Sequence, residues 1–252
     1  YLTLFILLAA VSIASASDYK EPTTGMEFVL IKGGSFDMGD LRGNGYDIER
    51  PAHKVTVKSF YMGVYEVTFD QYDKFCEATK RDKPSDNNWG RGNQPVINVN
   101  WEDANAFAAW LSQENGRKFR LPSESEWEYA ARGGRQTEFW WGDQVDQNNA
   151  NCADCGSKWD GHQAAPVGSF SANPFGLHDM HGNFYEWCQH TRHDNYEGAP
   201  ADGKAWTGGP TPNQNVVRSG SYLMPAFESR ARARSWNQSQ RSSREQGIRL
   251  VV

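Results

Sequence analysis

The sequence predicts a single α+β domain that is rich in loops and has little regular secondary structure. The 252 residues include 24 glycines and ten tryptophans, whereas helical bundles favour Ala, Leu, Glu and Lys. Residues 134–212 show no strong helical or strand periodicity, and no internal repeat or linker divides the chain. A loop region of that length inside a compact domain needs another organiser, for which bound metal and buried tryptophan are the expected candidates.

Strands are predicted near both ends of the domain. Residues 26–31 and 54–60 alternate in side-chain character, and residues 216–222 and 247–252 are apolar. Short runs of this kind, bounded by turn residues, are typical of β-strands.

Three helices are predicted from capping signals. Thr68 and Ser123 are each followed three residues later by Gln or Glu, which is the spacing of a capping box. The second helix is expected to begin at Asn100 or Asp103 and to end at Gly116. Each helix carries apolar residues on one face, as a helix packed on a core does.

The N-terminal segment 1–17 resembles an export signal. Residues 2–13 are apolar and are followed by Ala14-Ser15-Ala16, a small-x-small sequence suited to signal peptidase. The apolar run is shorter than the roughly 20 residues that span a bilayer. We therefore expect an exported protein, periplasmic or secreted, with a domain at 25–252. A retained N-terminal membrane anchor, and with it a membrane-attached assembly, is the alternative.

The charge distribution argues against a nucleic-acid partner. The net charge is −5, which provides no overall attraction to phosphate backbones. Residues 218–249 are locally rich in arginine, and a mixture of structural ion pairs and solvated positions explains most of them.

One loop carries a possible cation site. In residues 165–187, Asp179 and Glu186 stand seven apart across the turn at Gly182. Two carboxylates and the carbonyls between them are the oxygen ligands that calcium prefers. The alternative is that Asp179 caps a turn and Glu186 makes a surface ion pair.

Several segments together resemble the sulfatase-modifying-factor family, whose best-known member is the formylglycine-generating enzyme. The matching segments are 25–39, 49–57, 65–68, 120–134, 165–187, 218–222 and 247–249. The resemblance implies a C-type-lectin-like domain of the formylglycine-generating-enzyme type, with structural calcium.

Two structural calcium sites follow from this resemblance. The ligands of one would be the side chains of Asp179 and Glu186 and the carbonyls of Gly182 and Phe184. The ligands of the other would be Asn151, the Cys152 carbonyl, Asp160 and the His162 carbonyl. Oxygen ligands from separated loops suit calcium.

The copper site of the formylglycine-generating enzyme is not expected. That enzyme holds copper by two thiolates in its C-terminal segment, but no cysteine follows Cys188 here. Met224 aligns with the first thiolate, and the second falls near Ala226. One thioether does not replace two thiolates. We therefore predict no catalytic residues for formylglycine generation and no copper.

The leading hypothesis is a binding or structural module whose partner is a protein, peptide or small molecule. Arg and Trp are frequent in binding hot spots, although the alternating arginines have an equally good structural explanation. The residues proposed for the binding cleft are Tyr185, Ser221, Met224, Phe227, Glu228, Arg230, Arg232, Arg234 and Trp236. The competing hypothesis is a metal-dependent oxidoreductase, as in periplasmic relatives of the family, with Tyr185, Glu228, His190 and His193 as candidates. Exposed loop positions are the alternative for both histidines.

The four cysteines leave alternatives open. A local disulfide between Cys152 and Cys155, or two plain thiols, is favoured over redox catalysis or zinc, which takes four ligands. Cys76 and Cys188 either pair across the core or pack as small apolar side chains.

Overall fold

Three small sheets and three α-helices form the regular structure of residues 18–252, the part of the chain that this computed structural model describes. Helices account for 18% and strands for 22%, which confirms the predicted loop-rich α+β class. The predicted signal peptide or anchor at 1–17 lies outside the described residues. Among those described, no helix combines the length and apolar character needed to cross a membrane.

The sheets have the strand orders β1-β2-β5, β3-β4 and β8-β7-β6-β9. All pairs are antiparallel except β6 with β9. The bounds are β1 Tyr19–Lys20, β2 Glu27–Ile31, β3 Gly34–Met38, β4 His53–Val57, β5 Phe60–Gly63, β6 Tyr185–Arg192, β7 Thr211–Arg218, β8 Ser235–Gln238 and β9 Gln246–Gly247. Short 3₁₀ turns occur at Asp47–Glu49 (η1) and Ala226–Ser229 (η2).

The helices begin where the capping signals predict. They are α1 (Phe69–Thr79), α2 (Trp101–Asn115) and α3 (Glu124–Arg132), and their N-caps Thr68, Asn100 and Ser123 all form capping boxes. Asn100 rather than Asp103 is therefore the cap of α2, and Asp103 is the reciprocal partner in its box.

The strand predictions need four corrections. Residues 54–60 contribute to two strands, β4 and β5, and the strand expected at 216–222 is β7, which ends at Arg218. At the end of the chain, β9 is followed by an isolated bridge at Val251. The stretch 134–212 is not free of strands, because it contains β6. That strand lies between β7 and β9, and residues 186–188 are all buried, so it lacks the alternation that a half-exposed strand shows.

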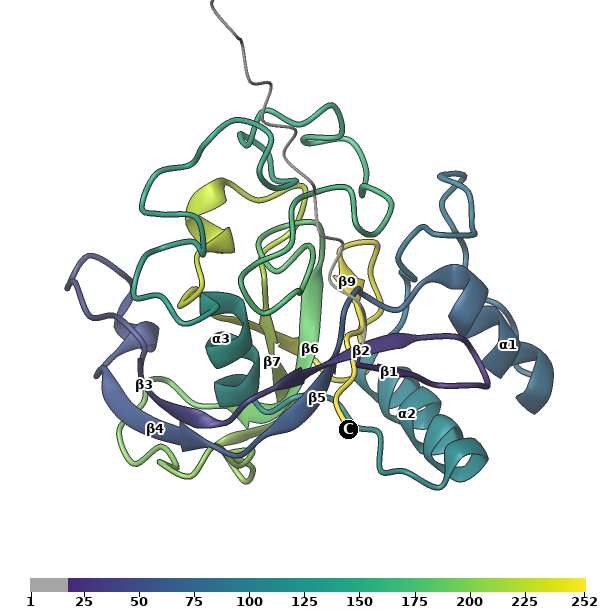
Figure 1. Cartoon of the computed structure of the whole chain (residues 1–252), viewed down its shortest axis with the longest axis horizontal. Coiled ribbons are helices and arrows are strands. Elements are labelled where there is room, and N and C mark those ends of the chain that lie inside the picture. The colour runs from purple at the N-terminus through teal and green to yellow at the C-terminus, as the bar shows by residue number, and fades with distance from the viewer. Residues whose placement is uncertain (1–17) are drawn as a thin grey trace, which may run out of the picture.

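Two apolar cores hold the elements together. Trp187 on β6 belongs to the core that α1 and α2 cover, and Trp127 on α3 belongs to the core beneath β2 to β5. Both indoles are fully buried. Long loops occupy the end of the molecule above these cores, together with η2 (Figure 1).

Candidate functional site

The predicted calcium loops and the C-terminal cleft segment lie side by side. Gly182 N–H donates to Ser219 O over 2.6 Å, Asn183 N–H donates to Asn151 O over 2.7 Å, and Ala153 N–H donates to Met224 O over 2.8 Å. A side chain at Gly182 would collide with the Asn151 carbonyl, so glycine is required there. The backbone therefore joins the two predicted calcium loops directly.

Three buried acidic side chains, Glu66, Asp179 and Glu186, form the carboxylate cluster. Asp179 Oδ2 accepts from Gly168 N–H over 2.6 Å, and Glu66 Oε2 accepts from Asn183 Nδ2 over 2.7 Å. Asp179 Oδ1 and Glu66 Oε1 are buried and have no partner among residues 18–252. Unpartnered buried carboxylate oxygens are costly.

The cluster is short of positive charge. Glu186 Oε1 accepts from Arg249 Nη2 and Glu186 Oε2 from Trp127 Nε1, both over 2.7 Å. Within the described residues, Arg249 is the cluster's single ion-pair partner, so three carboxylates face one guanidinium. Burial raises the pKa of Glu66, and the neighbouring Asp179 and Glu186 raise it further. Burial likewise raises the pKa of Asp179.

These features fit a hard cation. Two oxygens without partners and an excess of negative charge are what bound calcium would satisfy. Glu66 was not among the predicted ligands, although it lies in segment 65–68, which contributes to the family resemblance. The alternative of Glu186 in a surface pair is wrong, because this side chain is fully buried. The Gly182 carbonyl accepts from Ser219 Oγ over 2.8 Å.

At the second predicted calcium site, some of the proposed ligand side chains are already held by hydrogen bonds. Asn151 Oδ1 accepts from Ser157 Oγ over 2.9 Å, and Asp160 Oδ2 accepts from Gly156 N–H. Asp160 Oδ1 is buried and unpartnered within the described chain. This orphaned oxygen fits a cation, with the carbonyls of Cys152 and His162 on the same loop.

A disulfide joins Cys152 to Cys155, as one of the two alternatives expected. It lies inside the second predicted calcium loop, and Asp154 Oδ1 accepts from Ala226 N–H over 2.7 Å. The disulfide-closed turn therefore also holds the segment that follows Met224, through this hydrogen bond. Cys76 and Cys188 are free and buried, so they pack as apolar side chains and do not pair.

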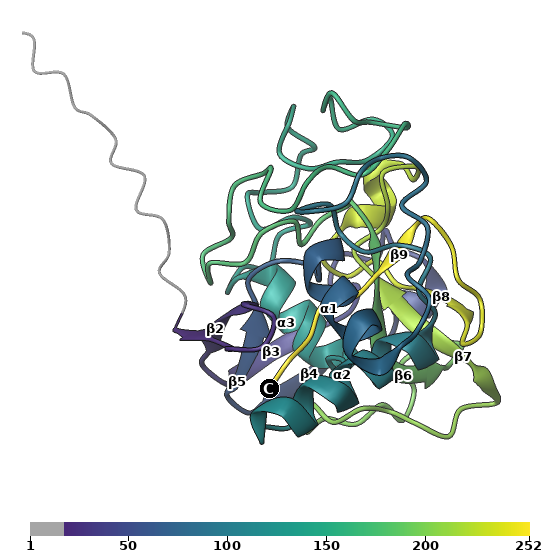
Figure 2. The ribbon, with the colours of Figure 1, turned by 90° about the vertical axis from the view of Figure 1, so that its right-hand side faces the viewer.

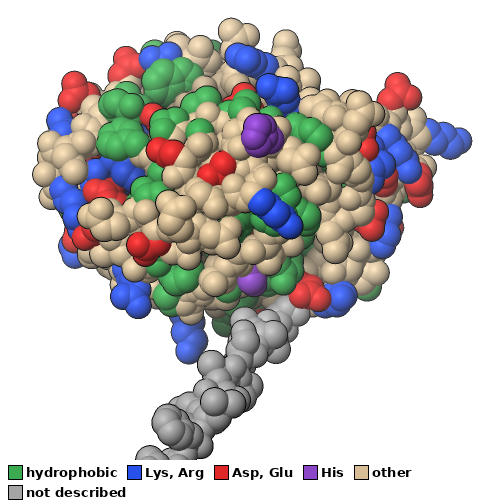
Figure 3. All heavy atoms as spheres, turned by 90° about the horizontal axis from the view of Figure 1, so that it is seen from above, with side chains coloured by type: hydrophobic (Ala, Val, Ile, Leu, Met, Phe, Trp, Pro, Cys, Tyr) green, Lys and Arg blue, Asp and Glu red, His purple; other side chains and the backbone are tan. Residues whose placement is uncertain are grey.

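The cleft is a cavity of about 380 Å³ whose lining includes Tyr185, Met224 and Glu228. Ser221 is buried beside it and donates through Oγ to Glu245 Oε2, on the cavity wall, over 2.9 Å. Phe227, next to Glu228 in the chain, is not a lining residue; it is 39% exposed, with its ring edge-to-face with Tyr46. Seen from above, this end of the molecule shows hydrophobic side chains with acidic ones among them (Figure 3).

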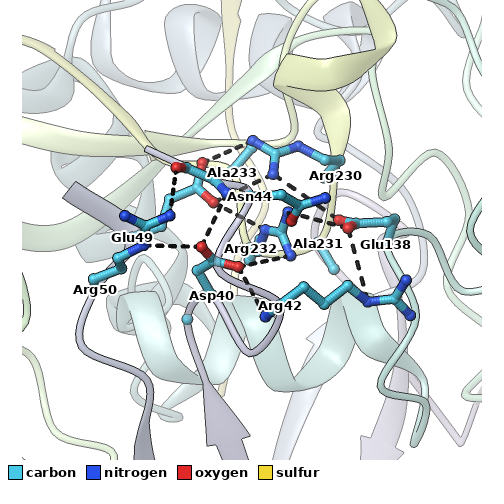
Figure 4. A network of polar contacts seen from close by, with 12 residues as sticks. Asp40, Arg42, Asn44, Glu49, Arg50, Glu138, Arg230, Ala231, Arg232 and Ala233 are labelled. Carbon is cyan, nitrogen blue, oxygen red and sulfur yellow. Dashed lines mark hydrogen bonds and ion pairs between the residues drawn. The ribbon is translucent and has the colours of Figure 1, made fainter. Parts of the chain in front are cut away.

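Arg230, Arg232 and Arg234 are directed inward. Each is at most 4% exposed, and each pairs with carboxylates from distant segments. Figure 4 shows Arg230 and Arg232 among these carboxylates. This arginine network also includes Arg218. The ion pairs of the four arginines are Arg230–Glu49, Arg230–Glu138, Arg232–Asp40, Arg232–Glu49, Arg232–Glu138, Arg234–Glu124, Arg218–Glu124 and Arg218–Glu128. The structure thus differs from the ligand-binding role expected for these residues and matches the structural alternative.

The remaining candidates lie apart from the cavity lining. Trp236 faces Arg192, whose guanidinium lies 3.9 Å from the ring centroid. His190 is not an exposed loop residue, because it lies on β6 and its Nδ1 accepts from Glu124 N–H over 2.9 Å. Burial lowers the pKa of His190 to about 4. His193 stacks on Trp206.

The copper ligands of a formylglycine-generating enzyme have no equivalent here. Met224 lines the cavity with a thioether, and Ala226 is buried and offers no ligand atom. A single thioether does not fit the two-thiolate site that copper requires in that enzyme.

Comparisons with known proteins give a consistent result. The model of the sulfatase-modifying factor enzyme 1-like domain matches residues 14–252. The formylglycine-generating enzyme of Streptomyces coelicolor is 30% identical, with 88% of each chain covered. The serine/threonine-protein kinase Pkn1 of Chlamydia trachomatis is 30% identical over 78% of this chain, which spans about 33% of Pkn1.

Two further relatives extend this range. An inactive Cα-formylglycine-generating enzyme 2 of Bos taurus is 28% identical, with 64% of this chain and 70% of the relative covered. The solved structure of PvdO from Pseudomonas aeruginosa superposes with a TM-score of 0.82 at 30% identity, covering 92% of this chain and 96% of PvdO. The matches thus include active and inactive proteins.

Proposed function

This chain belongs to the sulfatase-modifying factor enzyme 1-like family, and from that membership we propose that it is an exported, calcium-stabilised binding module that does not generate formylglycine. The resemblance predicted from the sequence is thereby confirmed, as is the fold class.

The observation that carries the proposal is the chemistry at Met224 and Ala226. Copper in its reduced state is held by soft sulfur ligands, and here one thioether stands where the family's enzyme has two thiolates. Both free cysteines, Cys76 and Cys188, are buried, and burial raises the pKa of each thiol. Neither thiol is therefore prepared to act as a thiolate ligand.

Calcium is proposed for the two loops because the family binds calcium and because the carboxylates there lack partners. Asp179 Oδ1, Glu66 Oε1 and Asp160 Oδ1 are the oxygens that need one. Asp179 and Asp160 are ligand positions carried over from the family. Glu66 is added to the proposed ligands because its Oε1 is buried and has no partner within the described residues. When bound, calcium would supply positive charge and fix the loops, and no reaction step is assigned to it.

The cleft supplies the binding function. Tyr185, Glu228 and Glu245 provide polar groups in the cavity, and Phe227 and Tyr46, which donates to Glu228, are exposed aromatic side chains. Aromatic anchors beside a small set of polar groups are typical of ligand sites. The partner is a protein, a peptide or a small molecule.

A cysteine-oxidation assay tests the proposal. The purified protein, supplied with calcium and copper, is incubated with a sulfatase-derived peptide that contains cysteine, beside the Streptomyces coelicolor enzyme as the positive control. We expect mass spectrometry to find no aldehyde product with this protein. Conversion of the peptide would overturn the proposal.

Metal analysis separates the binding module from the competing oxidoreductase. The binding module predicts calcium without stoichiometric copper or iron after purification. Stoichiometric copper or iron that is lost on Met224→Ala or His193→Ala would instead support catalysis through other ligands.

A further inference from the structure

A second cavity lies between the beginning of α2 and the sheet β8-β7-β6-β9, and none of its lining residues lines the cleft. Its volume is about 660 Å³, within the range of roughly 300–1,000 Å³ that is usual for small-molecule sites. Trp101, Gln189, Asn213 and Gln240 are among its lining residues. Figure 2 views the molecule from the side on which α2 lies near β6, β7 and β8.

Most of the lining residues carry a side-chain amide or hydroxyl group. Glu102 is the one charged residue on the wall, within the described chain. The side chains of Gln189, Asn213 and Gln240 make no hydrogen bond inside residues 18–252. A side-chain amide both donates and accepts hydrogen bonds, as does a ligand hydroxyl group. These free amides therefore match a ligand that carries several hydroxyl groups.

The wall behind these amides is fixed. Trp101 Nε1 donates to Cys188 O over 2.9 Å, which holds the indole in place. Asn215 is 2% exposed; it donates through Nδ2 to His190 O over 3.2 Å and accepts from Ser239 Oγ over 2.7 Å. A wall that is already ordered lowers the entropy cost of binding.

Three main-chain N–H groups around the cavity are already paired. Ser239 N–H donates to Asn213 O over 2.8 Å, Trp101 N–H donates to Ser239 O over 3.0 Å, and Thr191 N–H donates to Trp206 O over 3.1 Å. An extended peptide that binds by adding a strand needs free main-chain groups, which these residues do not offer. Anionic ligands lack a cationic partner here, because neither Lys nor Arg lines the cavity within the described residues.

We infer that this cavity binds a neutral, polyhydroxylated ligand, namely a segment of an uncharged oligosaccharide. The free amides hydrogen-bond the sugar hydroxyl groups, and Trp101 provides the apolar surface of the site. This binding activity is independent of the cleft and of the proposed calcium sites.

An array of neutral glycans tests the inference. It carries α- and β-linked oligomers of glucose, galactose, mannose and N-acetylglucosamine, together with sulfated glycans and polar peptides for comparison. We expect the calcium-loaded protein to retain at least one class of neutral glycan. Calorimetry then measures the affinity for the glycan that binds best.

Two variants connect the binding to this cavity. Asn213 and Gln240 are exposed, so Asn213→Ala and Gln240→Ala leave the fold intact, which circular dichroism checks. Each is expected to lower the affinity about fivefold, the effect of losing one hydrogen bond. Gln113→Ala changes an exposed glutamine farther along α2 and leaves the affinity unchanged.

Three results would overturn the inference. They are the absence of binding to every neutral glycan, preferential binding of the sulfated glycans or peptides, and glycan binding that neither Asn213→Ala nor Gln240→Ala weakens.

Discussion

The carboxylate cluster and the arginine network both bury acidic side chains, but they differ in how the charge is neutralised. In the network, Asp40, Glu49 and Glu138 each meet at least one guanidinium. In the cluster, Glu186 meets Arg249, whereas Glu66 and Asp179 have no ion pair within residues 18–252. The two regions are similarly buried, but only in the arginine network does every one of these carboxylates have an ion-pair partner.

This difference in ion pairing distinguishes the arginine network, which is structural, from the carboxylate cluster, which is the proposed cation site. Buried charges are tolerated when partners and hydrogen bonds surround them, and the arginine network meets this condition with its own residues. The carboxylate cluster does not, and an added cation would complete it. The same reasoning explains why Arg230, Arg232 and Arg234 do not serve the cleft, because their guanidiniums are already occupied.

The largest expected effect is the removal of a network arginine. Arg218→Met leaves Glu128 with one guanidinium, Arg132, and weakens the surroundings of Glu124. We expect a loss of about 3–5 kcal/mol in the free energy of unfolding, as for breaking a buried ion pair. Urea denaturation measures it. Arg42→Met, whose side chain is 40% exposed, should cost less than about 1 kcal/mol, and equal costs would contradict the contrast.

Calcium should produce the next largest effect. At a concentration about 100 times the dissociation constant, a ligand that binds only the folded state adds about 2.7 kcal/mol, which corresponds to a rise in Tm of roughly 5–10 °C for a domain of this size. Thermal denaturation with EDTA, calcium or magnesium measures the response.

Asp179→Asn supplies the matched variant for that response. Without calcium it should be at least as stable as the wild type, because it removes one unpaired carboxylate. It should also lose a large part of the calcium response, whereas Asp146→Asn on an exposed loop should retain all of it. A full response in Asp179→Asn would refute the proposed ligand.

Acid should weaken the network through His190. Burial lowers the pKa of His190 to about 4 in the folded protein, although the nearby Glu124 opposes this, while Arg234, Arg218 and His193 add to it. The unfolded chain, with a His pKa of about 6.5, takes up the proton first. Stability therefore falls as the pH drops from about 7 towards 4, by about 2 kcal/mol at pH 5.

His190→Asn keeps an acceptor for the Glu124 N–H but removes the titration. Urea denaturation at pH 7.5 and pH 5 should show a smaller loss for this variant than for the wild type. An identical pH dependence would exclude His190 as the source.

The smallest effect is expected in the cleft. Glu228 is half-buried and accepts from Tyr46 Oη over 3.0 Å. Glu228→Gln retains an acceptor there, so the free energy of unfolding should change by less than about 0.5 kcal/mol, as measured by urea denaturation. A loss of several kcal/mol would mean that this carboxylate is as structural as those of the network.

Local signals predicted the helices and the family well. The capping boxes at Thr68 and Ser123 require only residues three positions apart, so the sequence alone determines where α1 and α3 begin. The strand β6 was missed because it is buried in the middle of a sheet and therefore lacks alternation. Secondary structure with local causes was thus predictable, whereas structure with tertiary causes was not.

The candidate site divides in the same way. Resemblance indicated Asp179 and Glu186, but the role of Glu66 depends on the approach of a segment more than one hundred residues away in the chain. The partners of Arg230 and Arg232 are likewise distant: both pair with Glu49. Pairings of this kind carry no local sequence signal, so the direction of the arginines could not be predicted from their spacing.

The most direct test of the central claim is the calcium content of the folded protein. The metal-stripped wild type, Asp179→Asn and Glu228→Gln are dialysed against calcium, and elemental analysis gives the bound metal per chain. We expect two calcium ions for the wild type and Glu228→Gln, and one for Asp179→Asn. A wild type without calcium, or an Asp179→Asn variant with the same content as the wild type, would contradict this expectation.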